Sequence, residues 1–454
     1  MLDIIILAAG DGKRMKSSRP KVLQPVGGRP MLDHLLDAVE GLQPDRSQVV
    51  IGAGAEMVRQ ALAGRAVEFV TQEQRLGTGH AAMQALPKID PQSRVLILPG
   101  DMPLIRTETL QHLLASEADL AVLSFIADDP DGYGRVVRAA DGAVSAIVEH
   151  KDASREQRAI HEVNSGVMCA RAGAWSDWLN RVGADNAQGE YYLTDCIGIA
   201  TAAGQRVAAV VADDPEQLRG ANDREQLAEL EQVHQARSRR SIMAQGATLA
   251  DPSSVHICGS VQCGRDVWIG PGVMLAGNIT LGDDVSIGPG CVLTDCDLAA
   301  GTRLEPYCVL DGVRTIGACT IGPFARLRPG TELSSGVKIG NFVEIKNARF
   351  APGAKASHLT YVGDAEIGER ANLGAGTITC NYDGANKHRT RIGADAFVGS
   401  NTALVAPVTI GEGATIGAGS VVTHAAPKGQ LTLSRARQKT VEGWQRPRKR
   451  DSNV

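Results

Sequence analysis

The first 220 residues alternate short apolar runs with amphipathic segments. Segments such as 31–42 and 79–87 carry apolar residues at helical spacing and predict helices. The apolar runs are rich in β-branched residues and predict buried strands at 3–7, 47–54, 67–70, 94–101 and 119–125. Strands that alternate with helices are typical of a Rossmann-like α/β domain with a parallel, doubly wound sheet. Ligands on such sheets bind beyond the carboxyl ends of the strands.

A different pattern begins after residue 220. Residues 221–243 contain neither Gly nor Pro, and Leu227, Leu230 and Val233 share one helical face. We therefore expect a linker helix at 221–245 between an N-terminal domain, 1–220, and a C-terminal domain, 246–454.

The C-terminal domain repeats an apolar residue every sixth position, with two five-residue steps. The series comprises Ile257, Cys263, Ile269, Leu275, Leu281, Ile287 and Leu293; Leu298, Leu304, Leu310 and Ile316; Ile321, Leu327, Leu333, Ile339 and Ile345; and Ile392, Val398, Leu404, Ile410, Ile416 and Val422. Three hexapeptides close one triangular coil, so the repeat predicts a left-handed parallel β-helix with coils about 4.8 Å apart. Residues 348–364 and 376–391 interrupt the period, and function is expected there. The flat faces of such a column favour a homotrimer.

Composition narrows the class of protein. Aromatic residues make up 4% of the chain against 51 glycines, and the net charge of −4 argues against a nucleic-acid partner. The basic run 446–450 is expected to be a solvated terminus. Nine cysteines without a C-x-x-C pair indicate reduced thiols rather than a zinc site. Because no stretch resembles a signal peptide or a membrane span, we expect a soluble, cytoplasmic protein with no membrane partner.

The first candidate site follows the first predicted strand. The stretch LAAGDGKRM, residues 7–15, is a glycine-spaced turn whose backbone N–H groups could hold phosphate. Arg14 and Lys21 could neutralise the phosphate charge, and Asp101 could either cap a helix or bind Mg²⁺. Polar islands at 72–81, 132–135, 147–152, 163–167 and 220–224 are each compatible with ordinary turns. Together these features favour nucleotidyl transfer.

The second candidate site lies in the interrupted part of the repeat. His358 and Tyr361 fall there, although a lone histidine is more often structural than catalytic. Arg328 and Lys346 are 18 residues apart, which is one full coil, so they should stack at one corner. Two cations about 4.8 Å apart repel each other unless an anion such as a sugar phosphate lies beside them.

The motif L-x-A-G-x-G-x-R-M, followed by Pro20-Lys21, resembles the sugar-1-phosphate nucleotidyltransferases. Over about residues 4–445 the chain resembles the bifunctional N-acetylglucosamine-1-phosphate uridyltransferase/glucosamine-1-phosphate acetyltransferase family. The resemblance implies that the chain acetylates glucosamine-1-phosphate with acetyl-CoA and then transfers UMP from UTP. The products would be UDP-N-acetylglucosamine, a precursor of peptidoglycan and lipopolysaccharide, and pyrophosphate.

The resemblance also implies roles in the first site. Arg14 and Lys21 would be catalytic, and Asp101 and Asn222 would bind Mg²⁺. The nucleotide and sugar would be bound by Leu7, Ala8, Ala9, Gly10, Lys21, Gln72, Gly77, Thr78, Pro99, Gly100, Asp101, Gly134, Glu149, Asn164 and Asn222, of which Gln72, Gly77 and Thr78 would read the uracil. The family usually has Tyr-Gly-Asp where this chain has Pro99-Gly100-Asp101. Any contact made by the tyrosine is therefore lost, whereas the carboxylate remains.

In the second site the resemblance makes His358 the general base of acetyl transfer. Glucosamine-1-phosphate would be bound by Arg328, Lys346, Tyr361 and Asn372. Acetyl-CoA would be bound by Ala375, Asn381, Tyr382, Ser400, Ala418 and Arg435, the last from a C-terminal arm that could reach a neighbouring subunit.

Two other interpretations remain open. The chain could catalyse only nucleotidyl transfer, with the β-helix as a structural or regulatory module. It could also be a non-enzymatic scaffold that senses nucleotides. An assay that omits one substrate at a time separates the three.

Overall fold

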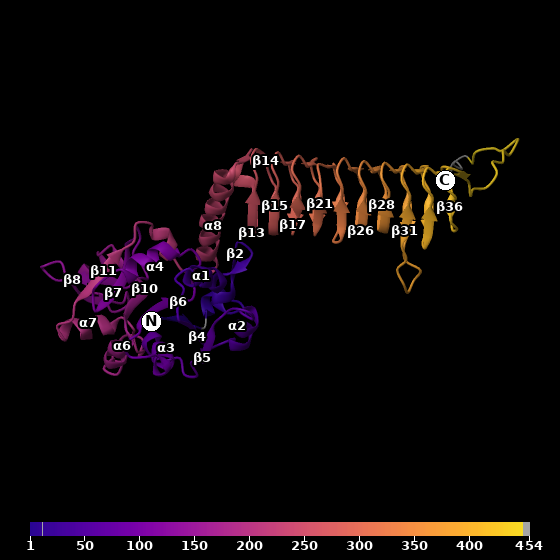
Figure 1. Ribbon diagram of the computed structural model, residues 1–454. Helices are drawn as coiled ribbons and strands as arrows, with labels where there is room; N and C mark the ends of the chain where they lie inside the picture. Colours follow the sequence, from indigo (N-terminus) through magenta and orange to yellow (C-terminus); the bar gives the residue numbers. More distant parts are fainter. Residues whose placement is uncertain (11, 448–454) are drawn as a thin grey trace, which may run out of the picture. The chain divides into compact units, whose positions relative to one another are not determined.

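The computed structural model describes residues 1–10 and 12–447, so part of the basic run 446–450 lies outside the described residues. The chain divides into two compact units, Met1–Arg237 and Ser238–Val454 (Figure 1). The helix α8, Arg224–Gln245, covers most of the predicted linker and contains the boundary between the units. Among the described residues, no helix is both long and apolar enough to cross a bilayer.

A mixed sheet forms the centre of the first unit. Its strand order is β11-β7-β10-β6-β1-β4-β5, and β8 and β9 form an antiparallel hairpin beside β10. The strands are β1 Leu2–Ala8, β4 Arg46–Ile51, β5 Glu68–Thr71, β6 Arg94–Pro99, β7 Leu120–Ile126, β8 Arg135–Arg138, β9 Val144–Val148, β10 Glu162–Arg171 and β11 Val207–Val211, with a separate pair β2 Pro25–Val26 and β3 Arg29–Pro30. All five strands expected from the apolar runs are present.

The expectation of a wholly parallel sheet is wrong, because β10 runs antiparallel to both β6 and β7. The stretch 163–167 appeared in the sequence as a polar island, yet it lies inside β10. The register of β10 against β7 shifts between Asn164 and Met168. Asn164, Ser165 and Gly166 fall at this irregularity, so their polar and small side chains interrupt the apolar alternation that would have revealed the strand.

Helices cover both faces of this sheet because its buried side chains alternate along each strand. Ile4 and Ile6 point toward α1, α2 and α4, whereas Ile5 points toward α3, α6 and α7. The helices are α1 Met31–Glu40, α2 Ala55–Ala61, α3 Thr78–Ala85, α4 Thr107–Leu114, α5 Arg155–Arg158, α6 Ala172–Leu179 and α7 Asp195–Ala202, with 3₁₀ turns η1 Lys13–Met15, η2 Lys21–Leu23, η3 Leu86–Lys88 and η4 Pro215–Leu218. Leu230 of α8 is buried against Met15 and Met31, so the start of α8 belongs to this core.

The second unit is a left-handed parallel β-helix, as the hexapeptide repeat predicts (Figure 1). One sheet contains, in order, β12 Ala247–Leu249, β14 Val267–Ile269, β16 Ser286–Ile287, β19 Arg303–Leu304, β22 Thr320–Ile321, β25 Lys338–Asn341, β27 Lys355–His358, β29 Asn372–Leu373, β32 Phe397–Val398, β35 Thr415–Ile416 and β37 Leu431–Thr432. The remaining strands are β13 His256–Cys263, β15 Met274–Leu281, β17 Val292–Thr294, β18 Asp297–Leu298, β20 Val309–Asp311, β21 Val313–Thr315, β23 Arg326–Leu327, β24 Thr331–Leu333, β26 Glu344–Phe350, β28 Tyr361–Ile367, β30 Ile378–Cys380, β31 Thr390–Ile392, β33 Ala403–Val405, β34 Val408–Ile410 and β36 Val421–Val422, and a 3₁₀ turn η5 spans Pro252–Ser254.

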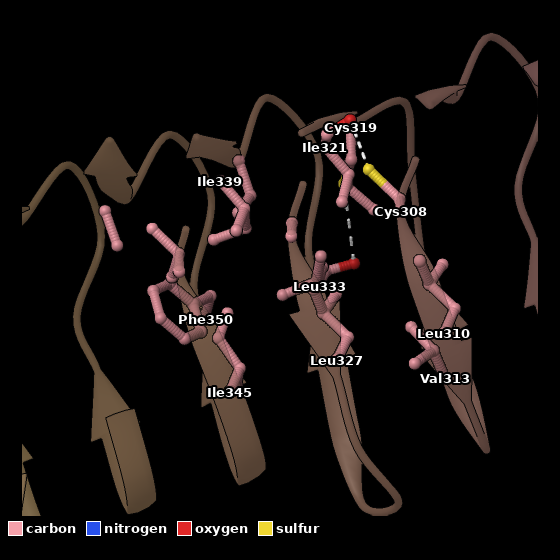
Figure 2. Close-up of a cluster of buried hydrophobic side chains, with 14 of the residues drawn as sticks. Cys308, Leu310, Val313, Cys319, Ile321, Leu327, Leu333, Ile339, Ile345 and Phe350 are labelled. Carbon is pink, nitrogen blue, oxygen red and sulfur yellow. Dashed lines mark hydrogen bonds between the residues drawn. The ribbon is translucent and has the colours of Figure 1, made fainter. Parts of the chain in front are cut away.

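The interior of the β-helix is a column of aliphatic side chains. Figure 2 shows Leu310, Leu327, Ile339 and Ile345 stacked between successive coils. All nine cysteines are free thiols, as expected from their spacing. In the interior, Cys308 Sγ lies 3.6 Å from the Ile321 carbonyl oxygen, which accepts a weak hydrogen bond from the thiol.

Two expectations about the repeat are wrong. Ile316 is 57% exposed, and the preceding Thr315 points inward instead. The Thr315 hydroxyl oxygen accepts a hydrogen bond from Ala299 N at 2.7 Å and lies 3.2 Å from the Thr302 hydroxyl, so its polar group is satisfied. Residues 348–364 are also not irregular, because β26, β27 and β28 pair in register with their neighbouring coils.

The second predicted interruption is a true insertion. Between β30 and β31 the chain leaves the coil as a loop that carries an antiparallel bridge between Tyr382 and Lys387 (Figure 1). The loop returns to the column at Thr390, which is fully buried. A polar loop on a rigid column is a place where ligand-binding residues can be held.

Candidate functional site

A cavity of about 620 Å³ opens in the first unit where β1 and β6 end. Most of the residues expected in the first site line this cavity together: Leu7, Ala8, Ala9, Gly10, Lys21, Gln72, Gly77, Thr78, Pro99, Asp101, Glu149 and Asn164. The first and last of these residues, Leu7 and Asn164, are 157 residues apart in the sequence. The fold therefore gathers the separate polar islands around one space large enough for a small-molecule ligand.

Three of the four remaining expected residues, Gly100, Gly134 and Asn222, are hydrogen-bonded to residues of the lining, whereas Arg14 is not among the residues that line the cavity. Gly100 N donates to the Leu7 carbonyl oxygen at 2.9 Å, and the Gly134 carbonyl oxygen accepts from Asn164 N at 2.8 Å. Asn222 Oδ1 accepts from Lys21 Nζ at 3.1 Å. Arg14 lies on the exposed side of η1.

Lys21 joins the two oxygen donors that were expected to bind a metal. Its ammonium forms an ion pair with Asp101 and a hydrogen bond with Asn222. Gly220 makes room for this arrangement, because a Cβ there would lie 2.9 Å from Asp101 Oδ2. Two hard oxygen atoms that converge on one cation suit Mg²⁺, which commonly takes one or two protein oxygens and completes its shell with water and substrate phosphate. Within residues 1–10 and 12–447 no group of three His, Cys, Asp or Glu gathers to hold a metal alone.

The glycine turn of the motif packs directly on Lys21. Gly12 has φ of 57°, and a Cβ there would lie 2.9 Å from the Lys21 Cβ. The left-handed backbone and the close approach both favour glycine at this position. Lys13 follows Gly12 and lines the cavity.

Two further carboxylates, those of Glu149 and Glu190, line the cavity. The Glu149 carboxylate accepts a hydrogen bond from the Thr194 hydroxyl at 2.9 Å. Burial raises the pKa of Glu149, and the nearby Asp195, Asp152 and Glu190 raise it further. Glu149 therefore retains a proton at a higher pH than an exposed glutamate does.

Several lining residues were missed from the sequence: Lys13, Val22, Arg75, Ala81, Gly166, Met168, Glu190, Leu193 and Thr194. Lys13 and Arg75 lie inside stretches that were singled out, so their charge could have identified them. Glu190 and Thr194 precede α7 and carry no local signal. They reach the cavity because this segment is joined to α3 and the turn before it: Tyr191 O accepts from Gly79 N at 2.8 Å, and Tyr191 N donates to the Leu76 carbonyl oxygen at 2.7 Å.

The second group of expected residues lies on the outside of the β-helix. His358 ends β27 and is exposed, with its Nδ1 2.7 Å from Asn341 Oδ1 on the preceding coil. Tyr361 begins β28 and pairs with Glu344, and Asn372 begins β29 and pairs with Lys355. The column thus presents these side chains at successive levels.

Positive charge gathers beside this group. Arg328 N donates to the Ile345 carbonyl oxygen at 2.8 Å, so Arg328 and Lys346 occupy equivalent positions on adjacent coils. The Arg328 guanidinium forms an ion pair with Glu344 at 3.0 Å. Lys387, from the inserted loop, lies close enough to Lys346 that it lowers the pKa of Lys346. Sequence analysis missed Lys387 because its proximity depends on how the inserted loop folds back.

A buried carboxylate lies under these cations. Asp364 accepts hydrogen bonds from Asn347 Nδ2 and Asn381 Nδ2, each at 2.5 Å. Burial alone would raise the pKa of Asp364, but these two bonds and the neighbouring lysines lower it. The Asn381 side chain therefore bonds to Asp364, and its backbone bonds to Thr379 and His388.

Three of the six residues expected to bind the coenzyme form a second column. Asn401 N donates to the Ala375 carbonyl oxygen at 2.7 Å, and Gly419 N donates to the Ser400 carbonyl oxygen at 2.8 Å. Ala375, Ser400 and Ala418 therefore follow one another at one corner. Arg435 reaches the end of this column, where its guanidinium donates to the Ala418 carbonyl oxygen at 2.9 Å. Tyr382 is exposed on the inserted loop.

Two family models match the chain. The MobA-like NTP transferase domain matches residues 4–249, and the bacterial transferase hexapeptide (six repeats) matches residues 260–295 and 389–424. A solved nucleotidyl transferase from Methanothermobacter thermautotroptrophicus covers 51% of this chain and 97% of its own, at 18% identity and a TM-score of 0.37.

Curated relatives match nearly the whole chain. The protein named "Bifunctional protein GlmU" from Azotobacter vinelandii is 55% identical over 450 residues, which cover 99% of both chains. The proteins of that name from Alkalilimnicola ehrlichii and Stutzerimonas stutzeri are each 54% identical over 451 residues, covering 99% of this chain and 97% and 100% of their own.

Proposed function

The chain belongs to the GlmU family of bifunctional proteins, and we propose from this membership that it carries out two reactions at two separate sites. The β-helix transfers the acetyl group of acetyl-CoA to the amine of glucosamine-1-phosphate. The N-terminal unit then transfers UMP from UTP to N-acetylglucosamine-1-phosphate and releases pyrophosphate and UDP-N-acetylglucosamine. The observation that carries the proposal is the match to GlmU relatives over 99% of the chain, across both units.

The uridylyl site is the cavity of the first unit. The base lies against Gln72, Gly77 and Thr78, and the sugar against Glu149 and Asn164, all of which line the cavity. A phosphate oxygen of the sugar attacks the α-phosphorus of UTP, and the bond to the β-phosphate breaks. Lys21, with Arg14 from the neighbouring turn, offsets the negative charge that develops on the phosphates.

Asp101 and Asn222 are the residues that would hold Mg²⁺, because their oxygens already converge on the Lys21 ammonium. A bound magnesium ion supplies charge neutralisation and orients phosphate oxygens. With Asp101 engaged by the metal, the Lys21 ammonium would be available to a substrate phosphate. Asn222 lies two residues before α8, so a metal held there would also tie the start of α8 to this unit.

The acetyl transfer site lies on the outside of the β-helix. Arg328, Lys346 and the additional Lys387 bind the phosphate of glucosamine-1-phosphate, which relieves the repulsion that lowers the Lys346 pKa. Tyr361 and Asn372 contact the sugar, and His358 removes a proton from the amine as it attacks the thioester. The column of Ala375, Ser400 and Ala418 provides the surface for acetyl-CoA, with Asn381, Tyr382 and Arg435 at its edges.

An exposed ridge supports assembly into a homotrimer. Tyr307, Phe324, Phe342 and Leu359 are all exposed and follow one another at one corner of the β-helix. The Tyr307 and Phe324 rings stack with centroids 5.2 Å apart, and the Phe324 and Phe342 rings with centroids 5.4 Å apart. All four have positive φ, which bulky residues rarely adopt without a benefit elsewhere. The ridge ends beside His358, so a second copy that covers it also borders the acetyl transfer site.

Light scattering tests the homotrimer. Wild-type protein should have three times the mass of the chain, and Phe342→Glu should shift it to the monomer because a charge would be buried. Monomeric wild-type protein would contradict the assembly.

The two activities are tested with separate variants and with omission of one substrate at a time. His358→Ala should abolish acetylation and leave uridylyl transfer unchanged, and Asp101→Ala should do the reverse. A chain that accepts N-acetylglucosamine-1-phosphate but never acetylates glucosamine-1-phosphate would instead be a single-activity nucleotidyltransferase with a structural β-helix.

A further inference from the structure

Two adjacent coils pair in register beside His358. β25 and β27 pair in parallel, with Asn341 opposite His358. One position earlier on the same two coils, a Cβ on Gly340 would lie 1.9 Å from the Ser357 carbonyl oxygen, so a side chain cannot be accommodated at residue 340. This close contact places the Asn341 and His358 side chains next to each other.

The backbone on both sides of His358 is also held in place. Leu359 N donates to the Asn341 carbonyl oxygen at 3.0 Å, and the Thr360 hydroxyl donates to the His358 carbonyl oxygen at 2.7 Å. Only the ring of His358 remains to be oriented. The contact that orients it is the one between Nδ1 and Asn341 Oδ1, at 2.7 Å.

An amide oxygen only accepts hydrogen bonds, so this contact requires the ring proton to be on Nδ1. The lone pair is then on Nε2, the nitrogen that points away from Asn341. A general base needs its lone pair on the atom that faces the substrate.

We propose that Asn341 is a positioning residue for acetyl transfer: it holds His358 in the tautomer whose Nε2 accepts the proton of the substrate amine. This rests on the proposed role of His358. As the nitrogen–carbon bond to the acetyl group forms, Nε2 takes the amine proton. When the carbon–sulfur bond breaks, the imidazolium returns that proton to the departing thiolate of CoA, so the neutral ring is restored.

Three variants of the full chain test the proposal. Asn341→Ala removes the acceptor and should lower kcat for acetyl transfer about 3- to 10-fold, with KM for glucosamine-1-phosphate within twofold of wild type. Asn341→Asp retains only acceptor atoms, so its kcat at high pH should stay within threefold of wild type. Its carboxylate should also move the acidic limb of the pH profile to higher pH, because it raises the pKa of His358. Asn278→Ala is the matched control, since Asn278 also bonds to an adjacent coil but lies far from His358 in the repeat.

A second measurement does not depend on activity. Nitrogen-15 NMR of labelled histidine should show His358 protonated on Nδ1 in the wild type and in the control, and a mixture of tautomers in Asn341→Ala. The proposal is overturned if Asn341→Asp is as defective as Asn341→Ala, or if the tautomer is the same in Asn341→Ala as in the wild type. If His358→Ala still acetylates, the proposed function of His358 is wrong, whatever the tautomer.

Discussion

Two partly buried histidines join α8 to the catalytic unit and should make this junction sensitive to acid. His34 of α1 and His234 of α8 meet edge to face with ring centroids 5.1 Å apart. The His34 Nε2–H donates to the Val26 carbonyl oxygen at 2.8 Å, a bond that favours the protonated ring and partly opposes the effect of burial. Burial and, to a smaller extent, repulsion by His34 together lower the pKa of His234 to about 4. Burial likewise lowers the pKa of His34.

Charged groups around the pair partly oppose one another. Glu231 on α8 raises the pKa of His234, whereas Arg237 on α8 and Arg29 on β3 lower it. Asp33 and Asp37, on the same helix as His34, raise the pKa of His34. The net effect is that both rings are neutral in the folded unit at neutral pH.

The sign of the pH dependence follows from the lowered pKa. The unfolded His234 has a pKa of 6.5 and the folded one about 4, so the stability is complete above pH 6.5 and is lost as the pH falls toward 4. At pH 5 the difference corresponds to about 2 kcal/mol, and screening by solvent at the partly exposed ring reduces it to about 1 kcal/mol. The loss of stability should be felt in the first part of α8, residues 224–237, which packs on the first unit through His234.

Hydrogen exchange measured by mass spectrometry on the full chain tests this. The free energy of opening of residues 224–237 should fall by about 1 kcal/mol more in the wild type than in His234→Gln between pH 7.5 and pH 5. His112→Gln, which removes an exposed histidine of α4, should behave as the wild type does. Equal acid sensitivity of wild type and His234→Gln would refute the reasoning.

Three further predictions concern separate parts of the chain. Lys13 lines the cavity beside the glycine turn, so Lys13→Gln should raise KM for UTP about tenfold. In the reverse reaction it should raise KM for pyrophosphate by about the same factor and leave KM for UDP-N-acetylglucosamine unchanged. Lys16→Gln is the control, and an unchanged KM for pyrophosphate would contradict this prediction. Lys387→Met should raise KM for glucosamine-1-phosphate about tenfold. Because Lys387 lowers the pKa of Lys346, the same variant should raise that pKa in an NMR titration. An unchanged pKa would show that the two ammonium groups are not close to each other. Leu327→Ala, in the interior of the β-helix, should destabilise that unit by about 2–5 kcal/mol, so that heating inactivates acetyl transfer earlier while uridylyl transfer keeps its wild-type inactivation temperature.

Local sequence patterns were sufficient for the elements whose signals repeat or stand alone. The five apolar runs formed strands, and the six-residue period identified the β-helix because each coil buries the same positions against its neighbours. The pattern failed where a polar residue takes an apolar position, as Thr315 does. A hydroxyl can be buried there only because Thr302 and the backbone of Ala299 satisfy it, and those partners lie on another turn.

The sequence by itself determined the fold types of the two halves and predicted most of the residues that line the cavity of the first unit, because periodicity and short motifs depend on neighbours in the chain. The tertiary structure alone decided that β10 runs antiparallel, that Lys387 comes beside Lys346, and that Asn341 meets the His358 ring. Each of these depends on which coil or strand becomes the neighbour in space. Pairing of that kind is set by the packing of the whole chain, and no local stretch of residues encodes it.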